Sequence, residues 1–295
     1  MIIDCHTHIW SRVEQLGENA EIYLQRQSGR ESLAAGPSEH AEAATPVDRS
    51  LVLAMRSRHL KANVPNDLVA EYVARHSEKM IGVAAVDPTE KSAASEAAEL
   101  LDRTEFRCLT ISPVGQNFHP ADSRAIKLYE LAAEADAPLI VQTGTHFPTN
   151  GRMEYARPLL WDEIARDYPT MTIVISSLGH PWVEEAIALI GKHDRVFADI
   201  AGLIRRPWQA YNALVLAHQF NVMDKILFGS DFPYSTAAEA IESVYRLHEV
   251  TQGTNLPSVP RETLRSMVER DALALLGIAR PGEVYASGQA EEDEL

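Results

Sequence analysis

Eight short apolar runs, separated by segments of helical periodicity, restrict the fold of this sequence more than any other feature. Several runs lack alternation of apolar and polar residues, which is typical of parallel strands covered by helices on both faces. Eight strands alternating with helices over roughly 250 residues match the size of a (β/α)₈ TIM barrel. We therefore predict one such domain over residues 1–280, with strands at 1–5, 50–54, 81–86, 106–112, 138–143, 172–177, 196–200 and 225–229.

The segments between these runs predict amphipathic helices, several of which begin with proline or a capping residue, as at Asp87-Pro88 and His180-Pro181. A doubly wound sheet is the alternative fold. That fold usually has fewer strands and more often carries a glycine-rich turn after the first strand, where this chain has Asp4-Cys5-His6-Thr7-His8. The predicted helices cover 66–76, 90–103, 121–135, 153–168, 181–191, 207–220 and 237–250.

Two segments lie outside the regular alternation. Residues 11–49 form a long, polar first βα connection, which we expect to fold over the catalytic end of the barrel. Residues 281–295 carry five acidic side chains and no basic one, so we predict a disordered acidic tail.

Composition excludes several classes of partner. The 27 Lys and Arg against 42 Asp and Glu give a net charge of −15, which repels nucleic acid and anionic membranes. The two cysteines are too few for a disulfide scaffold, and the sequence shows neither a signal peptide nor a membrane span, so we expect a cytoplasmic protein. A small-molecule substrate is the expected partner, and a homodimer is the commonest assembly for such a chain.

Two histidines at the end of the first strand are candidate metal ligands. Side chains alternate along a strand, so His6 and His8 are predicted to point into the barrel while Cys5 and Thr7 point outward. Two imidazoles at this spacing can converge on one divalent ion. Asp231 follows the eighth strand, which neighbours the first when the barrel closes, so it is expected to face the two histidines and to act as a ligand or general base.

Three motifs together resemble the amidohydrolase superfamily: Asp4-x-His6-x-His8, the segment from Gly179 to Trp182, and the segment from Phe228 to Pro233. The chain is most similar to the amidohydrolase-related (amidohydrolase 2) group, which includes aminocarboxymuconate-semialdehyde decarboxylase. This resemblance implies a metal-dependent barrel hydrolase or a non-oxidative decarboxylase. It also implies that His6, His8 and Asp231 hold a divalent metal, for which we expect zinc, with manganese as the alternative.

The sequence departs from the family pattern at two positions. Gln142 stands where similar proteins carry a metal-binding histidine at the end of strand five, and Ser177 stands where they carry a histidine that is catalytic or binds a second metal at the end of strand six. Neither residue reproduces imidazole, because an amide oxygen is a weaker zinc ligand and a serine hydroxyl does not shuttle protons near neutral pH. His146 and His180 lie in the same two loops and are candidates to supply imidazole instead: His146 or Gln142 as a further ligand, and His180 as a catalytic acid.

Candidate substrate-binding residues lie at the same end of the barrel. Arginines after strands two and seven, namely Arg56, Arg58, Arg205 and Arg206, can hold a carboxylate through paired hydrogen bonds, and Arg58 is the preferred one. For Arg205 and Arg206, pairing with nearby acids is the simpler explanation. Ser177 and Trp182 complete the predicted substrate-binding set.

From these residues we predict a metal-dependent hydrolase that opens a lactone, amide or ester of a small carboxylated substrate, with Asp231 as general base. Three alternatives stay open at this point. The first is a non-oxidative decarboxylase in which His180 donates the proton to carbon. The second is a metal-independent lactonase, and the third is a barrel that has lost catalysis and serves as a binding or structural subunit, because Gln142 and Ser177 replace the expected histidines.

Overall fold

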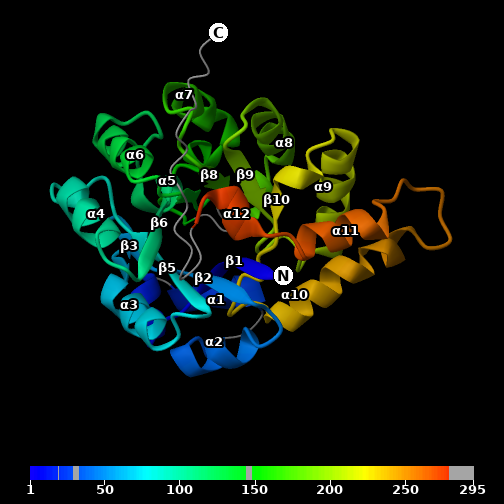
Figure 1. Ribbon diagram of the computed structural model, residues 1–295, viewed down its shortest axis with the longest axis horizontal. Coiled ribbons are helices and arrows are strands. Elements are labelled where there is room, and N and C mark those ends of the chain that lie inside the picture. The colour runs from blue at the N-terminus through cyan, green and yellow to red at the C-terminus, as the bar shows by residue number, and fades with distance from the viewer. Residues whose placement is uncertain (19, 29–32, 144–147, 279–295) are drawn as a thin grey trace, which may run out of the picture.

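Eight parallel strands form a barrel in the computed structural model, as the sequence predicts (Figure 1). The structure describes every residue except 19, 29–32, 144–147 and 279–295, so the predicted acidic tail at 281–295 lies outside the described residues. In spatial order the strands are β1 (Ile3–His8), β2 (Arg49–Leu53), β5 (Met80–Ala85), β6 (Phe106–Ile111), β7 (Leu139–Val141), β8 (Ile173–Ile175), β9 (Val196–Asp199) and β10 (Ile226–Leu227).

Backbone hydrogen bonds between β1 and the segment that follows β10 close the barrel. The Cys5 amide donates to the Phe228 carbonyl at 2.9 Å, and the His8 amide donates to the Phe232 carbonyl at 2.9 Å. Thr7 also forms a parallel bridge with Phe232, beyond the end of β10. The first and last strands therefore meet, as the positions of His6, His8 and Asp231 require.

Helices surround the barrel. They are α3 (Asn66–Arg75), α4 (Ala93–Leu101), α5 (Pro113–Gln116), α6 (Ser123–Glu134), α7 (Trp161–Asp167), α8 (Val183–Lys192), α9 (Pro207–Gln219), α10 (Ala237–Tyr245) and α11 (Arg261–Val268). Two predicted helices are shorter than expected. The first part of 153–168 forms the 3₁₀ turns η2 (Met153–Ala156) and η3 (Pro158–Leu160), and the end of 237–250 forms η6 (Arg246–Thr251). The shortest helical turns are the least predictable from periodicity.

One apolar core lies inside the sheet, and a larger one lies between the sheet and the helices. Inward side chains such as Leu51, Val83 and Cys108 pack with Leu273 and Leu276 of α12 (Ala272–Leu276). Figure 1 looks onto this end of the barrel, where α12 lies in front of the strands. Helix α12, the last helix in the described residues, therefore fills the end opposite the carboxyl ends of the strands.

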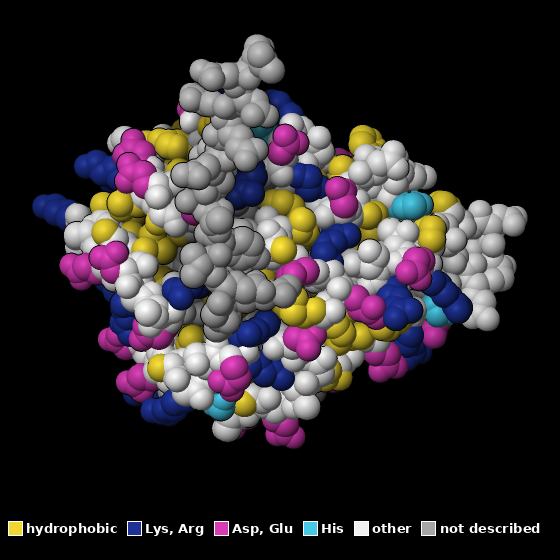
Figure 2. Space-filling model, viewed as in Figure 1, with side chains coloured by type: hydrophobic (Ala, Val, Ile, Leu, Met, Phe, Trp, Pro, Cys, Tyr) yellow, Lys and Arg dark blue, Asp and Glu magenta, His cyan; other side chains and the backbone are white. Residues whose placement is uncertain are grey.

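The surface at this end carries charges of both signs. Figure 2 shows Lys and Arg interspersed with Asp and Glu over the face that α12 and its neighbours present. None of the helices that the structure describes combines the length and apolar character needed to cross a lipid bilayer.

The insertion at 11–49 is largely helical. It contains η1 (Val13–Leu16), α1 (Ala20–Ser28) and α2 (Pro37–Ala43). A short hairpin of β3 (Met55–Ser57) and β4 (Ala62–Val64), which the sequence analysis missed, follows β2. Its strands have only three residues each, too few for a periodicity signal.

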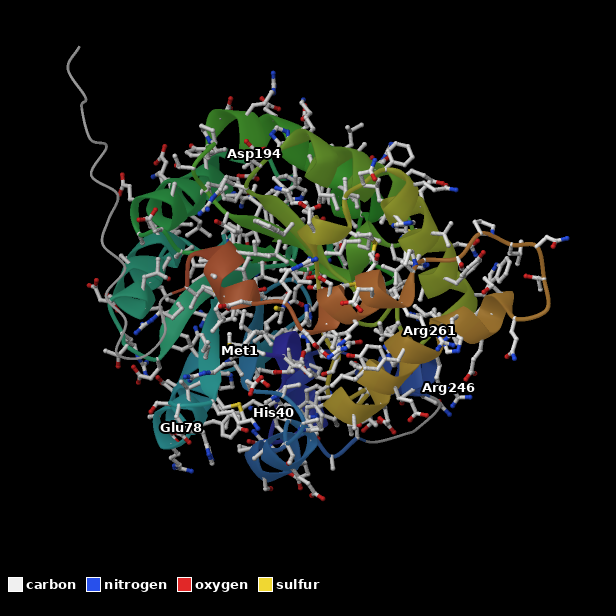
Figure 3. All side chains as sticks on the ribbon, turned by 45° about the vertical axis from the view of Figure 1, so that its right-hand side comes forward. Met1, His40, Glu78, Asp194, Arg246 and Arg261 are labelled. Carbon is white, nitrogen blue, oxygen red and sulfur yellow. The ribbon has the colours of Figure 1, made fainter. Side chains whose placement is uncertain are left out.

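His40 fastens α2 to the barrel (Figure 3). Its Nδ1 lies 2.8 Å from the hydroxyl of Tyr72 on α3, and its Nε2 lies 2.8 Å from the hydroxyl of Thr7 on β1. Burial, together with the charges of the nearby Lys79 and His76, lowers the pKa of this imidazole to about 3. The side chain is therefore neutral in the folded protein at neutral pH.

Replacing His40 with glutamine is predicted to change how stability depends on pH. Because the folded pKa lies below the unfolded value of about 6.5, the neutral histidine stabilises the fold fully at pH 7, and this contribution is lost as the pH falls toward 3. Between pH 7 and pH 5 the free energy of unfolding of the wild type should fall by about 2 kcal/mol more than that of His40→Gln, measured by urea unfolding. Tyr72→Phe, which keeps His40 buried, should retain the wild-type dependence. Parallel curves for wild type and His40→Gln would contradict this account.

Candidate active site

A cavity of about 200 Å³ opens at the carboxyl ends of the strands. Its polar lining comes mainly from strand ends, and its apolar lining comes from the insertion and from loops. The residues that line it are His6, His8, Leu16, Ala20, Leu24, Met55, Leu60, Ser112, Val114, Gly115, Gln142, Thr143, Pro148, Ser176, Ser177, Arg205, Asp231 and Tyr234. The cavity thus contains His6, His8, Asp231, Gln142 and Ser177 from the predicted site.

A β-bulge in β1 aims the two histidines. Asp4 pairs with Ser50 and Thr7 pairs with Val52, so β1 has one residue more than β2 over this interval. The prediction that Cys5 faces away from His6 is therefore wrong, because Cys5 packs in the inner core while His6 also lines the cavity. Thr7 does face outward, toward His40. Simple alternation fails because a bulge places two consecutive residues on the same side of the strand.

The ring of His6 is braced from behind by Asp199, at the end of β9. His6 Nδ1 lies 2.9 Å from Asp199 Oδ2. Asp199 Oδ1 accepts hydrogen bonds from the backbone amides of Ser177 at 2.8 Å and Ala201 at 2.9 Å. Asp199 therefore acts as a hydrogen-bond acceptor, and His6 donates its Nδ1 proton to it. In this tautomer the Nε2 of His6 carries a lone pair that points into the cavity.

The ring of His8 is held in a similar way. It hydrogen-bonds to the backbone carbonyl of Leu53, its partner in the β1–β2 pairing. Its Nε2 faces His6 Nε2 at 3.1 Å. Each imidazole therefore has an acceptor behind it and the other imidazole in front, and two neutral rings in this orientation set lone pair against lone pair. A proton or a metal cation between the two nitrogens removes the repulsion.

The surroundings of His6 and His8 move the pKa values of the two imidazoles in opposite directions. Burial lowers the pKa of His6, but the charge and hydrogen bond of Asp199, with the charges of Asp231 and Asp4, outweigh it and raise the pKa above its ordinary value. Burial and the neighbouring His6 lower the pKa of His8 to about 3. Without a metal, the first proton taken up by the pair therefore resides on His6 and is shared with His8.

Asp231 completes the cluster. Ligand atoms of His6, His8 and Asp231 all lie within 4.8 Å of one another. The backbone of Asp231 is left-handed, with φ of 61°, and its amide donates to the His6 carbonyl at 3.0 Å. Such a conformation is costly for a residue other than glycine, and it is common at functional sites that the surrounding structure enforces.

Arg205 pairs with this carboxylate. Its Nη2 lies 2.9 Å from Asp231 Oδ2, and its guanidinium lies over the ring of Tyr234, 4.9 Å from the ring centre. Burial raises the pKa of Asp231, an effect that the charge of Arg205 opposes. The sequence favours Arg58 over Arg205 for the substrate carboxylate, but Arg205 lines the cavity and Arg58 does not occur among the described residues that line it.

The segment after β8 takes an unusual path. Ser177, Leu178 and Gly179 are all left-handed, with φ of 55°, 47° and 64°. This turn aims the Ser177 amide at Asp199, and Ser177 itself lines the cavity. The backbone amide of Ser177 therefore supports the Asp199 carboxylate that holds His6.

The other predicted residues lie in different surroundings. Gln142 follows β7, lines the cavity and donates from Nε2 to the Thr110 hydroxyl at 3.1 Å. His146 lies outside the described residues. His180 is partly buried, and burial and the charge of Arg206 lower its pKa. Neither His180 nor Trp182 occurs among the described cavity-lining residues, so their catalytic and binding roles stay predictions.

Asp199 and Tyr234 were missed in the sequence analysis. Asp199 ends the seventh barrel strand much as Asp231 follows the eighth, so an acid directly after an apolar run was an available signal. Tyr234 follows Phe228–Pro233 with no comparable pattern.

The three clustered side chains fit a divalent metal. Bond lengths of about 2.0–2.1 Å from zinc to imidazole nitrogen place two nitrogens on one tetrahedral ion roughly 3.3 Å apart, close to the 3.1 Å observed. Two imidazoles and a carboxylate are a ligand set that zinc accepts with a position left for substrate or water. The carboxylate behind His6 is the usual support of a metal-binding histidine.

Comparison with known proteins identifies the family. The chain belongs to the amidohydrolase family, whose model matches residues 3–278, and it is therefore an enzyme of the hydrolase or carboxy-lyase type. No curated protein matches it.

Solved structures share the fold at low sequence identity. An uncharacterised TIM-barrel protein from Bordetella bronchiseptica is 22% identical with a TM-score of 0.70, covering 94% of this chain and 99% of its own. A 5-carboxyvanillate decarboxylase from Novosphingobium aromaticivorans, complexed with manganese and 4-hydroxy-3-methoxy-5-nitrobenzoic acid, is 13% identical with a TM-score of 0.68 and coverages of 94% and 96%. A probable 2-pyrone-4,6-dicarboxylic acid hydrolase from Acinetobacter baumannii is 15% identical with a TM-score of 0.64 and coverages of 94% and 99%.

Replacing Asp199 with asparagine tests whether the Asp199 carboxylate holds the ring of His6. The amide nitrogen of asparagine would face either the Nδ1–H of His6 or the two backbone amides, and each arrangement sets donor against donor. Urea unfolding should show a loss of about 1–3 kcal/mol, the cost of unsatisfied buried groups. Asp102→Asn, at an exposed helix end, should stay within about 0.5 kcal/mol of wild type. Equal effects for the two variants would mean that Asp199 does not hold His6.

Proposed function

We propose that this protein is a metal-dependent hydrolase that opens a lactone, amide or ester bond in a small carboxylated substrate. The observation that carries the proposal is the pair of Nε2 atoms, 3.1 Å apart, each on an imidazole with an acceptor behind it. Asp231 adds a carboxylate to the pair within ligand distance. This arrangement supports a bound cation better than it supports an empty pocket.

Zinc is the metal we propose, with manganese as the alternative. His6 and His8 would bind through Nε2 and Asp231 through its carboxylate. Imidazole suits both metals, and a related decarboxylase structure contains manganese. The metal would polarise the substrate carbonyl and lower the pKa of a water molecule.

The protein's own groups have separate tasks in this proposal. Asp231 accepts the proton of the attacking water, since its carboxylate lies beside the metal ligands. Arg205 lines the same cavity and attracts the substrate carboxylate, while its contact with Asp231 fixes the orientation of the base. Asp199 keeps His6 in the tautomer that exposes Nε2.

Decarboxylation is the second candidate, favoured by the structural similarity to 5-carboxyvanillate decarboxylase. That reaction needs an acid that protonates carbon, and the acid we expected, His180, is not among the described cavity-lining residues. The facing imidazoles argue against the metal-independent lactonase, and the intact cluster of His6, His8 and Asp231 argues against a barrel without catalysis.

The metal content of the protein tests the proposal. Protein purified without chelators should contain about one equivalent of zinc or manganese by inductively coupled plasma mass spectrometry. His6→Ala and Asp231→Asn should each lose this metal, because a two-ligand site binds it far more weakly. His218→Ala, on the outer helix α9, should retain it.

Turnover of the same samples decides between the reactions. The loaded wild type should release acid from lactones, esters or amides that carry a carboxylate, and should release no CO₂ from aromatic acids. A metal-free protein that still opens lactones would overturn metal dependence. CO₂ release without hydrolysis would replace the hydrolase by a decarboxylase.

A further inference from the structure

The cavity has an apolar wall that the proposed chemistry does not use. We define this wall as Leu16, Ala20, Leu24, Met55, Leu60 and Val114. All six residues come from outside the barrel strands: three from the insertion, two from the hairpin segment and one from α5. The polar groups that bind metal or move protons come instead from the strand ends, so reaction and selection use different parts of the chain.

The two residues that helix α1 contributes to the wall, Ala20 and Leu24, lie on the same face of the helix. Ala20 and Leu24 are four residues apart, one helical turn, and both line the cavity. Ile22 lies between them and is 47% exposed, whereas Leu24 is only 1% exposed. Leu24 packs in a cluster with Trp10, Val64 and Phe232, which fixes its position against the barrel. The part of the wall that α1 contributes is therefore held in place by packing against the barrel.

The wall limits what can bind. A hydroxyl-rich substrate would leave polar groups against side chains that offer no hydrogen bonds, which is unfavourable, whereas an apolar group gains by leaving water. A cavity of about 150 Å³ in another protein holds one benzene ring, so the volume of about 200 Å³ here suits a single ring with small substituents.

We infer that the substrate carries a compact apolar group, about the size of one six-membered ring, that packs against Ala20 and Leu24 while its carboxylate is held on the polar side. This inference rests on the proposed function for the carboxylate. The same wall disfavours polyhydroxylated lactones and acids on that side of the cavity. Ala20 determines the size limit, because it is the smallest side chain of the wall and any enlargement there reduces the cavity.

Isothermal titration calorimetry with three simple carboxylates tests the inference on the full-length protein, both metal-loaded and metal-stripped. Benzoate should bind at least tenfold more tightly than acetate, and gluconate should bind no better than acetate. Ala20→Leu should weaken benzoate at least tenfold and leave acetate within twofold. Ile22→Leu, the matched control on the exposed face of α1, should change neither. Leu24→Ala should weaken benzoate and improve the relative affinity of the larger 1-naphthoate, which keeps the test valid if Ala20→Leu displaces the helix.

Two outcomes overturn the inference: gluconate binding as tightly as benzoate, or an affinity of Ala20→Leu for benzoate within twofold of wild type. Because binding is measured with and without metal, failure of the proposed function is separable. Protein that contains no metal as purified, or that still opens lactones after the metal is stripped, refutes the metal-dependent hydrolase, and a benzoate preference kept by the same protein leaves the apolar wall standing. A metal-loaded protein that is an active hydrolase but binds gluconate more tightly than benzoate refutes only the inference that the apolar wall selects the substrate.

Discussion

The rest of the site depends on two imidazoles whose Nε2 atoms face each other at 3.1 Å. Each ring is held from behind, His6 by the Asp199 carboxylate and His8 by the Leu53 carbonyl. These acceptors fix both rings with a lone pair toward the cavity, which is unfavourable unless a proton or a metal cation lies between them. The two facing lone pairs therefore favour a positive charge at the carboxyl ends of the strands. Asp231 adds the negative charge that a divalent metal would balance.

Irregular backbone surrounds this pair, and regular hydrogen bonding supports it. The bulge in β1 turns His6 inward, the left-handed turn at Ser177 and Leu178 aims an amide at Asp199, and Asp231 is itself left-handed. Backbone hydrogen bonds between β1 and the segment after β10 close the barrel around these residues. Strained conformations of this kind persist where neighbouring structure over-determines them, and here they coincide with the proposed metal ligands.

The sequence predicts the barrel well, because buried parallel strands leave continuous apolar runs and the helices between them leave a 3.6-residue period. It also brings His6, His8 and Asp231 together, since the first and last strands must meet in a closed barrel. The inward position of Cys5 could not be predicted, because a bulge depends on pairing with a distant strand. The position of Arg205 in the cavity could not be predicted for a related reason: one sequence does not reveal whether an arginine after a strand turns toward solvent or toward Asp231.

Nitrogen-15 NMR of the histidine rings, recorded before and after one equivalent of zinc, tests the central claim most directly. Without metal near pH 6, the Nδ1 of both His6 and His8 should be protonated, with one further proton shared between the Nε2 atoms. Zinc should displace that proton and shift both Nε2 signals together, while both Nδ1 protons remain. Nε2 atoms that stay protonated in the presence of zinc, or zinc that binds through Nδ1, would contradict the account.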